Sequence, residues 1–419
     1  MPSGSGSPRS TGRRSHRSAL FYALLLKDSG CSSNAARMAA LFDTDERPVK
    51  RNFRLVDWTR LPQATLYLWE NVSPGGPVFE KARRVLGLGL RRVGTGRDLI
   101  EIRCERGADI SRLLGFPEET ARAIRSLDEH WDGSGYPDGL RGEEIPFLAR
   151  ICGLAQTAEA FYSAYGPRRA EEMVEGRRGR WFSLEVSGVF LQEAREGRLW
   201  ETLGGPRAGS EVSFREPPER VVIGTPERLD LVARAFARII DAKSPCTFRH
   251  SERVAAITAA VTEYMGFPEP VVRDQTRAGL LHDIGKLGVS SRILDKPGKL
   301  TPAEFAEVRK HPALTHNVLN LVSPFRSFAA TAAAHHEKLD GSGYHRGLTA
   351  RELSLPARIL AVADIYEALS SERPYRPPMP LERISSILRS ERETRLCAES
   401  VDALLTLASE DRLELPEAV

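Results

Sequence analysis

Cysteine is scarce in this sequence, and its distribution excludes two kinds of site. The chain of 419 residues has five cysteines and no Cys-x-x-Cys pair. They are odd in number and scattered along the chain, at Cys31, Cys104, Cys152, Cys246 and Cys397. We therefore expect neither a disulfide framework nor a cysteine-ligated zinc, and the pattern fits a reducing cytoplasm.

Long apolar runs and a strong excess of one charge are also missing. No segment approaches the ~20 apolar residues that cross a bilayer, so no membrane partner is expected. A net charge of +4 with 28% charged residues is too balanced to indicate DNA binding. The length and an apolar content of 41% predict two domains of ordinary size with packed cores.

The strict alternation of apolar and polar residues that is typical of β-strands is absent too, and the sequence instead carries signals for helices. Thr225-Pro226 and Thr301-Pro302 are typical helix starts, with a threonine cap before a proline in the first turn. Further helices are predicted at about 247–265, 269–285, 302–320, 325–337, 353–370, 380–390 and 398–409. The predicted fold class is all-α.

Histidine is concentrated in one part of the chain. Seven of the nine histidines lie between residues 250 and 345, and His282 is followed directly by Asp283 in an apolar, helix-like segment. A buried His-Asp pair is costly unless the two pair with each other or bind a metal. Adjacent helical residues project about 100° apart, which suits a shared metal cluster. Imidazole and carboxylate donors without a thiolate suit iron, manganese, zinc or nickel.

Seven blocks occur in one order across the second half. They are Thr247–Val254, His282–Lys286, Leu294–Thr301, Lys310–Pro312, His335–Tyr344, Ala363–Leu369 and Arg373–Arg376. With these blocks, residues 225–405 resemble an HD-GYP domain, a branch of the HD metal-dependent phosphohydrolases. The resemblance implies a helical domain that hydrolyses cyclic di-GMP to linear pGpG, GMP or both. It also implies divalent metal ions, for which iron or manganese is expected first and nickel or zinc second.

The resemblance also assigns roles to residues. The implied metal ligands are His250, His282, Asp283, His311, His335, His336 and Asp364. The implied substrate-binding residues are Lys286, Arg373, Arg376, Gly343 and Tyr344. Asp283 would bridge the metals and, with Lys286, form the catalytic pair, while the arginines would hold substrate phosphates.

Three departures from the family pattern bear on the details. His345 replaces the usual proline after Gly-Tyr, and Glu367 stands where the family mostly has aspartate. Position 246, four residues before His250, is a cysteine where three-metal members place a carboxylate ligand. We therefore expect two metals rather than three.

The first half resembles an altered copy of the second. Residues 132–151 and 340–359 are identical at 11 of 20 positions without a gap, an offset of 208 residues. Such self-similarity indicates a duplicated unit. At this offset the ligands His311, His335, His336 and Asp364 become Arg103, Leu127, Asp128 and Gln156. Upstream, a second alignment replaces His282 with Lys27 and Lys286 with Cys31, so the first copy is expected to be degenerate and metal-free.

These patterns divide the chain into four parts. We expect a disordered basic tail at 1–17, a degenerate HD-GYP-like domain at 18–201, a linker at 202–224 and a catalytic domain at 225–419. Between about 45 and 100 the sequence is rich in Arg and Gly, and predicts irregular structure with some helix. The degenerate half is expected to serve regulation or dimerisation.

Two alternatives to a cyclic di-GMP phosphodiesterase stay open at this point. One is the same hydrolysis acting on another cyclic dinucleotide or nucleotide, because the phosphate contacts would look the same for such a substrate as for cyclic di-GMP. The other is a non-catalytic nucleotide-sensing scaffold, which the intact ligand set disfavours. A homodimer and a signalling partner such as a diguanylate cyclase are further expectations.

Overall fold

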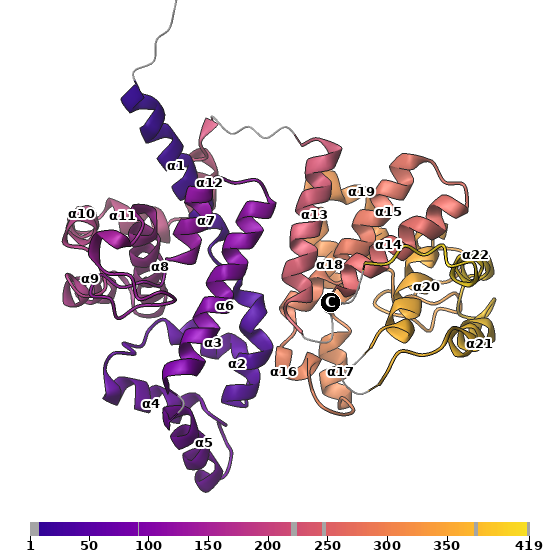
Figure 1. The fold of residues 1–419 in the computed structure, drawn as a ribbon, viewed down its shortest axis with the longest axis horizontal. Coiled ribbons are helices and arrows are strands. Elements are labelled where there is room, and N and C mark those ends of the chain that lie inside the picture. The colour runs from indigo at the N-terminus through magenta and orange to yellow at the C-terminus, as the bar shows by residue number, and fades with distance from the viewer. Residues whose placement is uncertain (1–7, 91, 219–223, 245–248, 373–375, 417–419) are drawn as a thin grey trace, which may run out of the picture. The chain divides into compact units, whose positions relative to one another are not determined.

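The computed structural model in Figure 1 describes residues 8–90, 92–218, 224–244, 249–372 and 376–416. Within these ranges the chain forms helices and three isolated bridges, with no strand. The predicted all-α fold is therefore confirmed. The chain divides into two compact units, Met1–Ile223 and Gly224–Val419, called unit 1 and unit 2 below. No helix in the described ranges has the length and apolar character to cross a bilayer.

Unit 2 is a helical bundle closed by two helices near its C-terminus. Its helices are α13 (Pro226–Asp241), α14 (His250–Tyr264), α15 (Glu269–Leu281), η5 (Ile284–Gly288), α16 (Ser291–Leu294), α17 (Pro302–Val308), α18 (His311–Asn320), η6 (Ser323–Phe325), α19 (Arg326–Ala333), α20 (Leu355–Ser370), α21 (Leu381–Glu391) and α22 (Ala398–Ser409). The two predicted helix starts are confirmed. Thr225 caps α13, and Thr301 forms a capping box with Glu304 at the start of α17.

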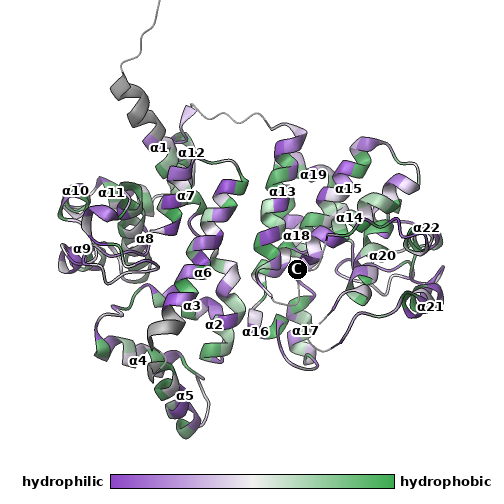
Figure 2. Ribbon diagram, in the orientation of Figure 1, coloured by the Kyte–Doolittle hydropathy of each residue, from purple (hydrophilic) through white to green (hydrophobic). Residues whose placement is uncertain are grey.

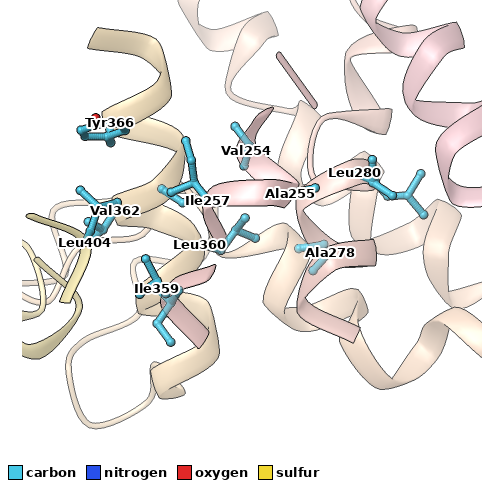
Figure 3. Packing of buried hydrophobic residues seen from close by; sticks show 14 of the residues in the cluster. Val254, Ala255, Ile257, Ala278, Leu280, Ile359, Leu360, Val362, Tyr366 and Leu404 are labelled. Atoms are coloured by element: carbon cyan, nitrogen blue, oxygen red, sulfur yellow. The ribbon is translucent and has the colours of Figure 1, made fainter. Parts of the chain in front are cut away.

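The core of unit 2 lies where α14, α15 and α20 meet. Val254 and Ile257 of α14 pack with Leu280 of α15 and Leu360 of α20, all nearly inaccessible to solvent (Figure 3). Apolar residues recur along the inner faces of these helices. Helix α13 also has both kinds of residue, with apolar residues toward the core and polar residues on the face away from it (Figure 2). The three helices that form this core also carry or adjoin the predicted metal ligands.

Two helices predicted as continuous are interrupted at ligand positions. The helix expected at 269–285 ends at Leu281, and a 3₁₀ helix begins after Asp283. The helix expected at 302–320 breaks between Val308 and His311, where Pro312 lies in the first turn of α18. Because proline lacks an N–H, it fits the first turn of a new helix and not the interior of an old one. The predicted ligands His282 and His311 therefore sit at helix ends.

Unit 1 is also helical throughout its described part. Its helices are α1 (Pro8–Leu26), η1 (Cys31–Asn34), α2 (Ala35–Phe42), α3 (Glu46–Phe53), α4 (Leu61–Asn71), α5 (Val78–Leu90), α6 (Arg92–Leu113), α7 (Glu118–Arg125), η2 (Gly142–Glu144), α8 (Phe147–Tyr165), α9 (Pro167–Arg177), α10 (Leu184–Arg195), α11 (Arg198–Gly204) and α12 (Ala208–Phe214). Helix α1 begins at Pro8, inside the expected disordered tail, whose residues 1–7 lie outside the described ranges. Extending a helix from the packed segment after Ser18 is easier than nucleating one, which explains the early start.

The segment 45–100 is more ordered than the sequence predicted. Helices α3, α4 and α5 lie within it, and Val49, Tyr67 and Val72 are buried in a cluster of their own. Gly87 lies within α5, although glycine costs a helix interior about 1 kcal/mol. Its neighbour Leu88 packs on the cluster, and such tertiary contacts override the low helix propensity. The expected linker at 202–224 is likewise partly helical, since α12 lies inside it.

Candidate metal centre

The seven predicted metal ligands come from five places in unit 2 and meet at one point. His250 begins α14, His282 ends α15, and Asp283 precedes η5. His311 begins α18, His335 and His336 follow α19, and Asp364 lies in the middle of α20. Three overlapping groups of these side chains place their donor atoms within 4.8 Å of one another. The structure thus brings all seven together.

Asp283 lies at the centre and faces two pairs of histidines. Its Oδ2 is 3.6 Å from His250 Nε2 and 3.3 Å from His282 Nε2. Its Oδ1 is 3.3 Å from His311 Nε2 and 3.7 Å from His335 Nε2. One carboxylate therefore lies between two pairs of histidine donors, with one oxygen facing each pair.

Asp364 and His336 complete the two groups. Asp364 Oδ1 lies 3.4 Å from His250 Nε2, on the side of the first pair. Its Oδ2 lies 3.9 Å from Nδ1 of His336, which groups with His311 and His335. His336 is the most exposed of the seven side chains, at 29%. The side of the cluster at His336 is therefore the side that solvent reaches.

Each inner histidine is held by its other ring nitrogen. The Nδ1 atoms of His282, His311 and His335 each lie 2.7 Å from a backbone carbonyl three residues earlier. Carbonyl oxygens only accept, so Nδ1 carries the proton and Nε2 is left with a lone pair. Partners of this kind fix the tautomer and ring orientation of metal-binding histidines.

These contacts are what a metal site requires and what an apolar core would avoid. Nε2 of His311 lies 3.0 Å from Nε2 of His335, and the Nε2 atoms of His250 and His282 are 3.3 Å apart. Facing lone pairs repel unless a proton or a cation lies between them. Asp283 Oδ1 is also buried without a hydrogen-bond partner among the described residues. The donor set therefore fits divalent metal ions.

Burial and neighbouring charges shift the pKa values of the cluster side chains in opposite directions. Burial lowers the pKa of His311 to about 3 and that of His336 to about 4, which keeps both rings neutral. Burial would raise the pKa of Asp283, but Lys286 and His282 hold it well below its usual range. Burial would also lower the pKa values of His250 and His282, but the neighbouring carboxylates raise both. Neutral imidazoles and ionised carboxylates are the forms that bind metals, so His250 and His282 would give up a proton when a metal binds.

The predicted substrate-binding residues differ in their placement. Lys286 lies in η5, and its Nζ is 2.5 Å from Asp283 Oδ2, so its ammonium lies at the cluster. The Tyr344 ring lies 4.8 Å from the His336 ring, at the exposed edge of the cluster. Arg309 covers Tyr344 at 4.8 Å from the ring centroid. The Tyr344 ring is therefore held beside the cluster.

The other predicted contacts are less close to the cluster. Arg376 donates to the carbonyls of Leu369 at 3.0 Å and Ala368 at 2.6 Å, at the end of α20. In this position it stabilises a helix C-terminus. A side chain at Gly343 would collide with the Glu337 backbone, so this glycine is required by packing. Arg373 lies outside the described residues.

Glu367 is a residue whose role sequence reasoning missed. Its Oε2 lies 2.5 Å from His250 Nδ1, and its Oε1 accepts from Ser371 and lies 3.4 Å from Arg253 Nε. Glu367 therefore directs Nε2 of His250 toward the cluster. The available signal was its spacing, because it follows Asp364 by three residues and so lies one helical turn further along α20.

Unit 1 carries ion pairs at the equivalent positions. Asp28 pairs with Lys27 and accepts from Arg54 at 2.6 Å, and these two cations hold its pKa well below the usual range although burial would raise it. Asp128 pairs with Arg103 and accepts from Gln156 at 2.8 Å. The metal-type donor groups found among the described residues all lie in unit 2.

The Asp-Gly-Ser-Gly-Tyr loop, at residues 132–136 in unit 1 and 340–344 in unit 2, is held by similar hydrogen bonds in both units. Glu129 accepts backbone N–H groups from Asp138 and Leu140, and Glu337 accepts them from Arg346 and Leu348. In each loop an aspartate also accepts from the serine two residues later. The loop therefore forms without a metal cluster beside it, which supports a structural reading of the Gly-Ser-Gly-Tyr motif in unit 1.

Comparison with known proteins agrees with this geometry. The profile of the HD domain family matches residues 94–177 and 234–399, so it recognises segments of both units. This chain belongs to the HD domain family, whose members are metal-dependent phosphohydrolases. Its similarity to HD-GYP phosphodiesterases confirms the resemblance inferred from the motifs.

Three relatives illustrate how far the similarity extends. A 3'3'-cGAMP-specific phosphodiesterase 3 of Vibrio cholerae serotype O1 is 39% identical, over 95% of this chain and 87% of its own length. The crystal structure of a cyclic GMP-AMP-specific phosphodiesterase from V. cholerae superposes with a TM-score of 0.58, at 35% identity over 95% of this chain and 87% of that one. A cyclic di-GMP phosphodiesterase of Thermotoga maritima is 42% identical over 39% of this chain and 45% of its own.

Proposed function

We propose that unit 2 is a two-metal phosphodiesterase that hydrolyses a 3′,3′-cyclic dinucleotide. The observation that carries this proposal is the division of the Asp283 carboxylate between two pairs of histidines. Two metals about 3.5–4 Å apart supply phosphodiester hydrolysis with an activated water and with positive charge on the phosphate. The His/carboxylate donors favour iron or manganese, with nickel or zinc as alternatives.

The two halves of the cluster would hold one metal each. His250, His282 and Asp283 supply the first position, and His311, His335 and His336 the second. Asp283 would contribute one oxygen to each position, and Asp364 would add an oxygen near each, as its distances to His250 and His336 support. Six of these seven residues begin, end or closely follow helices of the bundle, so the packing of the helices sets where their side chains lie.

The remaining site residues would handle the substrate. Lys286 lies beside Asp283 with 22% of its side chain exposed, so its ammonium can meet a phosphate oxygen at the cluster. Tyr344 presents an aromatic ring next to His336, where a nucleobase or ribose would lie against it. Arg373 and Arg376 stay predicted phosphate contacts, and Arg376 would have to leave its carbonyl partners to make one.

The preferred substrate is proposed from the relatives. The relative that matches nearly the whole chain is named for 3'3'-cGAMP, and shorter matches are named for cyclic di-GMP. We therefore place cyclic GMP-AMP first and the sequence-based expectation, cyclic di-GMP, second. The products would be the linear dinucleotide, mononucleotides or both.

Product analysis tests the proposal directly. Freshly purified, anaerobically handled protein would be incubated with each dinucleotide, and the products separated by chromatography while metal content is measured on the same sample. We expect metal-dependent cleavage, faster for cyclic GMP-AMP. Stoichiometric metal with no turnover of either substrate would favour the non-catalytic sensor instead.

The proposal also covers the location of the protein, its partners and the role of unit 1. The four cysteines in the described ranges are free thiols, which supports a reducing cytoplasm. A homodimer and a partner such as a diguanylate cyclase stay predictions, and we assign unit 1 a regulatory or dimerisation role. The ion pairs of Asp28 and Asp128 support a unit 1 without hydrolytic activity.

A further inference from the structure

Unit 1 contains a cavity at the place where the duplicated fold of unit 2 has its metal ligands. The cavity has a volume of about 320 Å³. Leu127, Asp128 and Gln156, the counterparts of His335, His336 and Asp364, form part of its wall. This volume is near the lower end of the roughly 300–1,000 Å³ of small-molecule sites, so it suits a small ligand.

The wall of the cavity is mainly apolar and contains several aromatic side chains. Trp58, Trp131 and Trp181 line it, with Phe42 and Phe53 from the segment before α4. His130 stacks on Trp181 with ring centroids 3.9 Å apart. Flat aromatic walls of this kind favour a planar ligand.

The charged groups of the wall already have partners. Arg54 donates to Asp28 at 2.6 Å, Arg150 pairs with Glu143 at 3.0 Å, and Asp128 pairs with Arg103. Burial lowers the pKa of His130 to about 4, so this ring is neutral at neutral pH. A charged ligand would have to break one of these pairs, so a neutral ligand or ligand moiety fits better.

Two polar atoms of wall residues lack partners. Gln156 donates through Nε2 to Asp128, whose carboxylate can only accept. The amide nitrogen therefore faces Asp128, and the amide oxygen Oε1 is the atom left for another partner. Gln156 Oε1 and the indole Nε1–H of Trp181 are both buried with no hydrogen-bond partner in the described part of the chain. These side chains are only 5% and 8% exposed. Buried unsatisfied polar atoms are uncommon, and here an acceptor and a donor belong to two residues that line the same cavity.

We propose that this cavity binds a neutral, planar heteroaromatic group of the purine class, in a site separate from the metal centre. The ligand would offer an amino or N–H group to Gln156 Oε1 and a ring nitrogen or carbonyl to Trp181 Nε1. Purine edges carry both kinds of group. Both protein atoms are inaccessible to solvent in this structure, so the proposal requires their side chains to turn toward the ligand as it enters. The group can come from a free nucleoside or from one base of a cyclic dinucleotide.

Tryptophan fluorescence isolates this site in the full-length protein. All five tryptophans belong to residues 58–200, hence to unit 1, and three of them line the cavity. The metal-loaded full chain would be titrated with adenosine and guanosine, and in a separate arm the chelator-treated full chain would be titrated with cyclic GMP-AMP, which the metal-loaded chain is proposed to cleave. We expect a saturable change with at least one of these probes, and the tightest probe identifies the source of the base.

Two substitutions in the cavity wall and one outside it complete the test. Trp181→Phe removes the indole N–H but keeps a ring, and Gln156→Leu removes the amide oxygen; we expect each to weaken binding about tenfold. Trp69→Phe is the matched control, since Trp69 is 41% exposed and lies outside the cavity wall. Calorimetry would confirm the affinities. Absence of saturable binding by all three probes, or equal affinity in both wall variants and the wild type, would overturn the proposal.

Discussion

Removing the Glu367 carboxylate should weaken one half of the metal centre more than the other. Glu367 holds His250 by a 2.5 Å contact to Nδ1 and is itself only 1% exposed. In Glu367→Ala, His250 loses the group that directs its Nε2 toward Asp283 and Asp364. The His311–His335–His336 position has its own carbonyl and packing contacts and should be spared.

The size of the effect follows from what such supporting groups contribute elsewhere. Losing a partner of a metal-binding histidine typically costs about 10–100-fold in metal affinity. At about 1.4 kcal/mol per tenfold, this corresponds to roughly 1.4–2.8 kcal/mol at the His250 position. Glu367→Gln should cost less, since the amide oxygen can still accept from Nδ1.

Chelator competition with elemental analysis measures this difference. We expect the alanine variant to lose about one of two metals at a chelator concentration that leaves the wild type loaded, and to lose most turnover. Glu372→Ala is the control, because this glutamate is exposed and near in the chain. Wild-type metal affinity and turnover in Glu367→Ala would refute the reasoning, and loss of both metals together would show that the two positions do not act separately.

Three further predictions concern the cluster and unit 1. Asp283→Ala and His335→Ala should each lose metal and activity while remaining folded, by elemental analysis, turnover and circular dichroism. Arg103→Ala should destabilise unit 1 by about 3 kcal/mol because it leaves the largely buried Asp128 carboxylate without its cation, and adding Asp128→Ala should restore part of this stability, as followed by tryptophan fluorescence in urea. The pKa of His130 falls from 6.5 to about 4 on folding because of burial, so the unfolded chain binds more protons between these values. The contribution of neutral His130 to the free energy of unfolding should therefore be complete above pH 6.5, and on the order of 3 kcal/mol of it should be lost as the pH falls toward 4. His130→Gln should make the urea midpoint of unit 1 depend less on pH over this range.

Each of these predictions has an outcome that contradicts it. Metal at normal stoichiometry or near-normal turnover in either cluster variant would mean that the ligand assignment is wrong. A double variant of Arg103 and Asp128 no more stable than Arg103→Ala would show that the ion pair does not explain the loss. A pH profile unchanged by His130→Gln would assign the acid sensitivity of unit 1 to other groups.

The sequence by itself determined the chemical character of the protein. The order of the histidine and aspartate blocks was sufficient to indicate the family, because metal chemistry requires those residue types and few others can replace them. The repeat at 132–151 and 340–359 indicated the duplication, and the substitutions Lys27, Arg103 and Gln156 marked the first copy as degenerate. Helix caps at Thr225 and Thr301 were also readable, since capping depends on neighbours a few residues apart.

Only the tertiary structure decided how distant residues meet. No local pattern shows that Asp283 divides its oxygens between two histidine pairs, or that Glu367 supports His250 from 117 residues away. Arg54 reaches Asp28 from a segment whose glycines and arginines gave no clear periodicity, and packing of Leu88 and its neighbours made that segment helical. The cavity lined by Trp181 and Gln156 likewise depends on two separate segments of unit 1, within residues 41–100 and 127–183. Local sequence fixes propensities and donor types, whereas close contacts between distant segments depend on how the whole core packs.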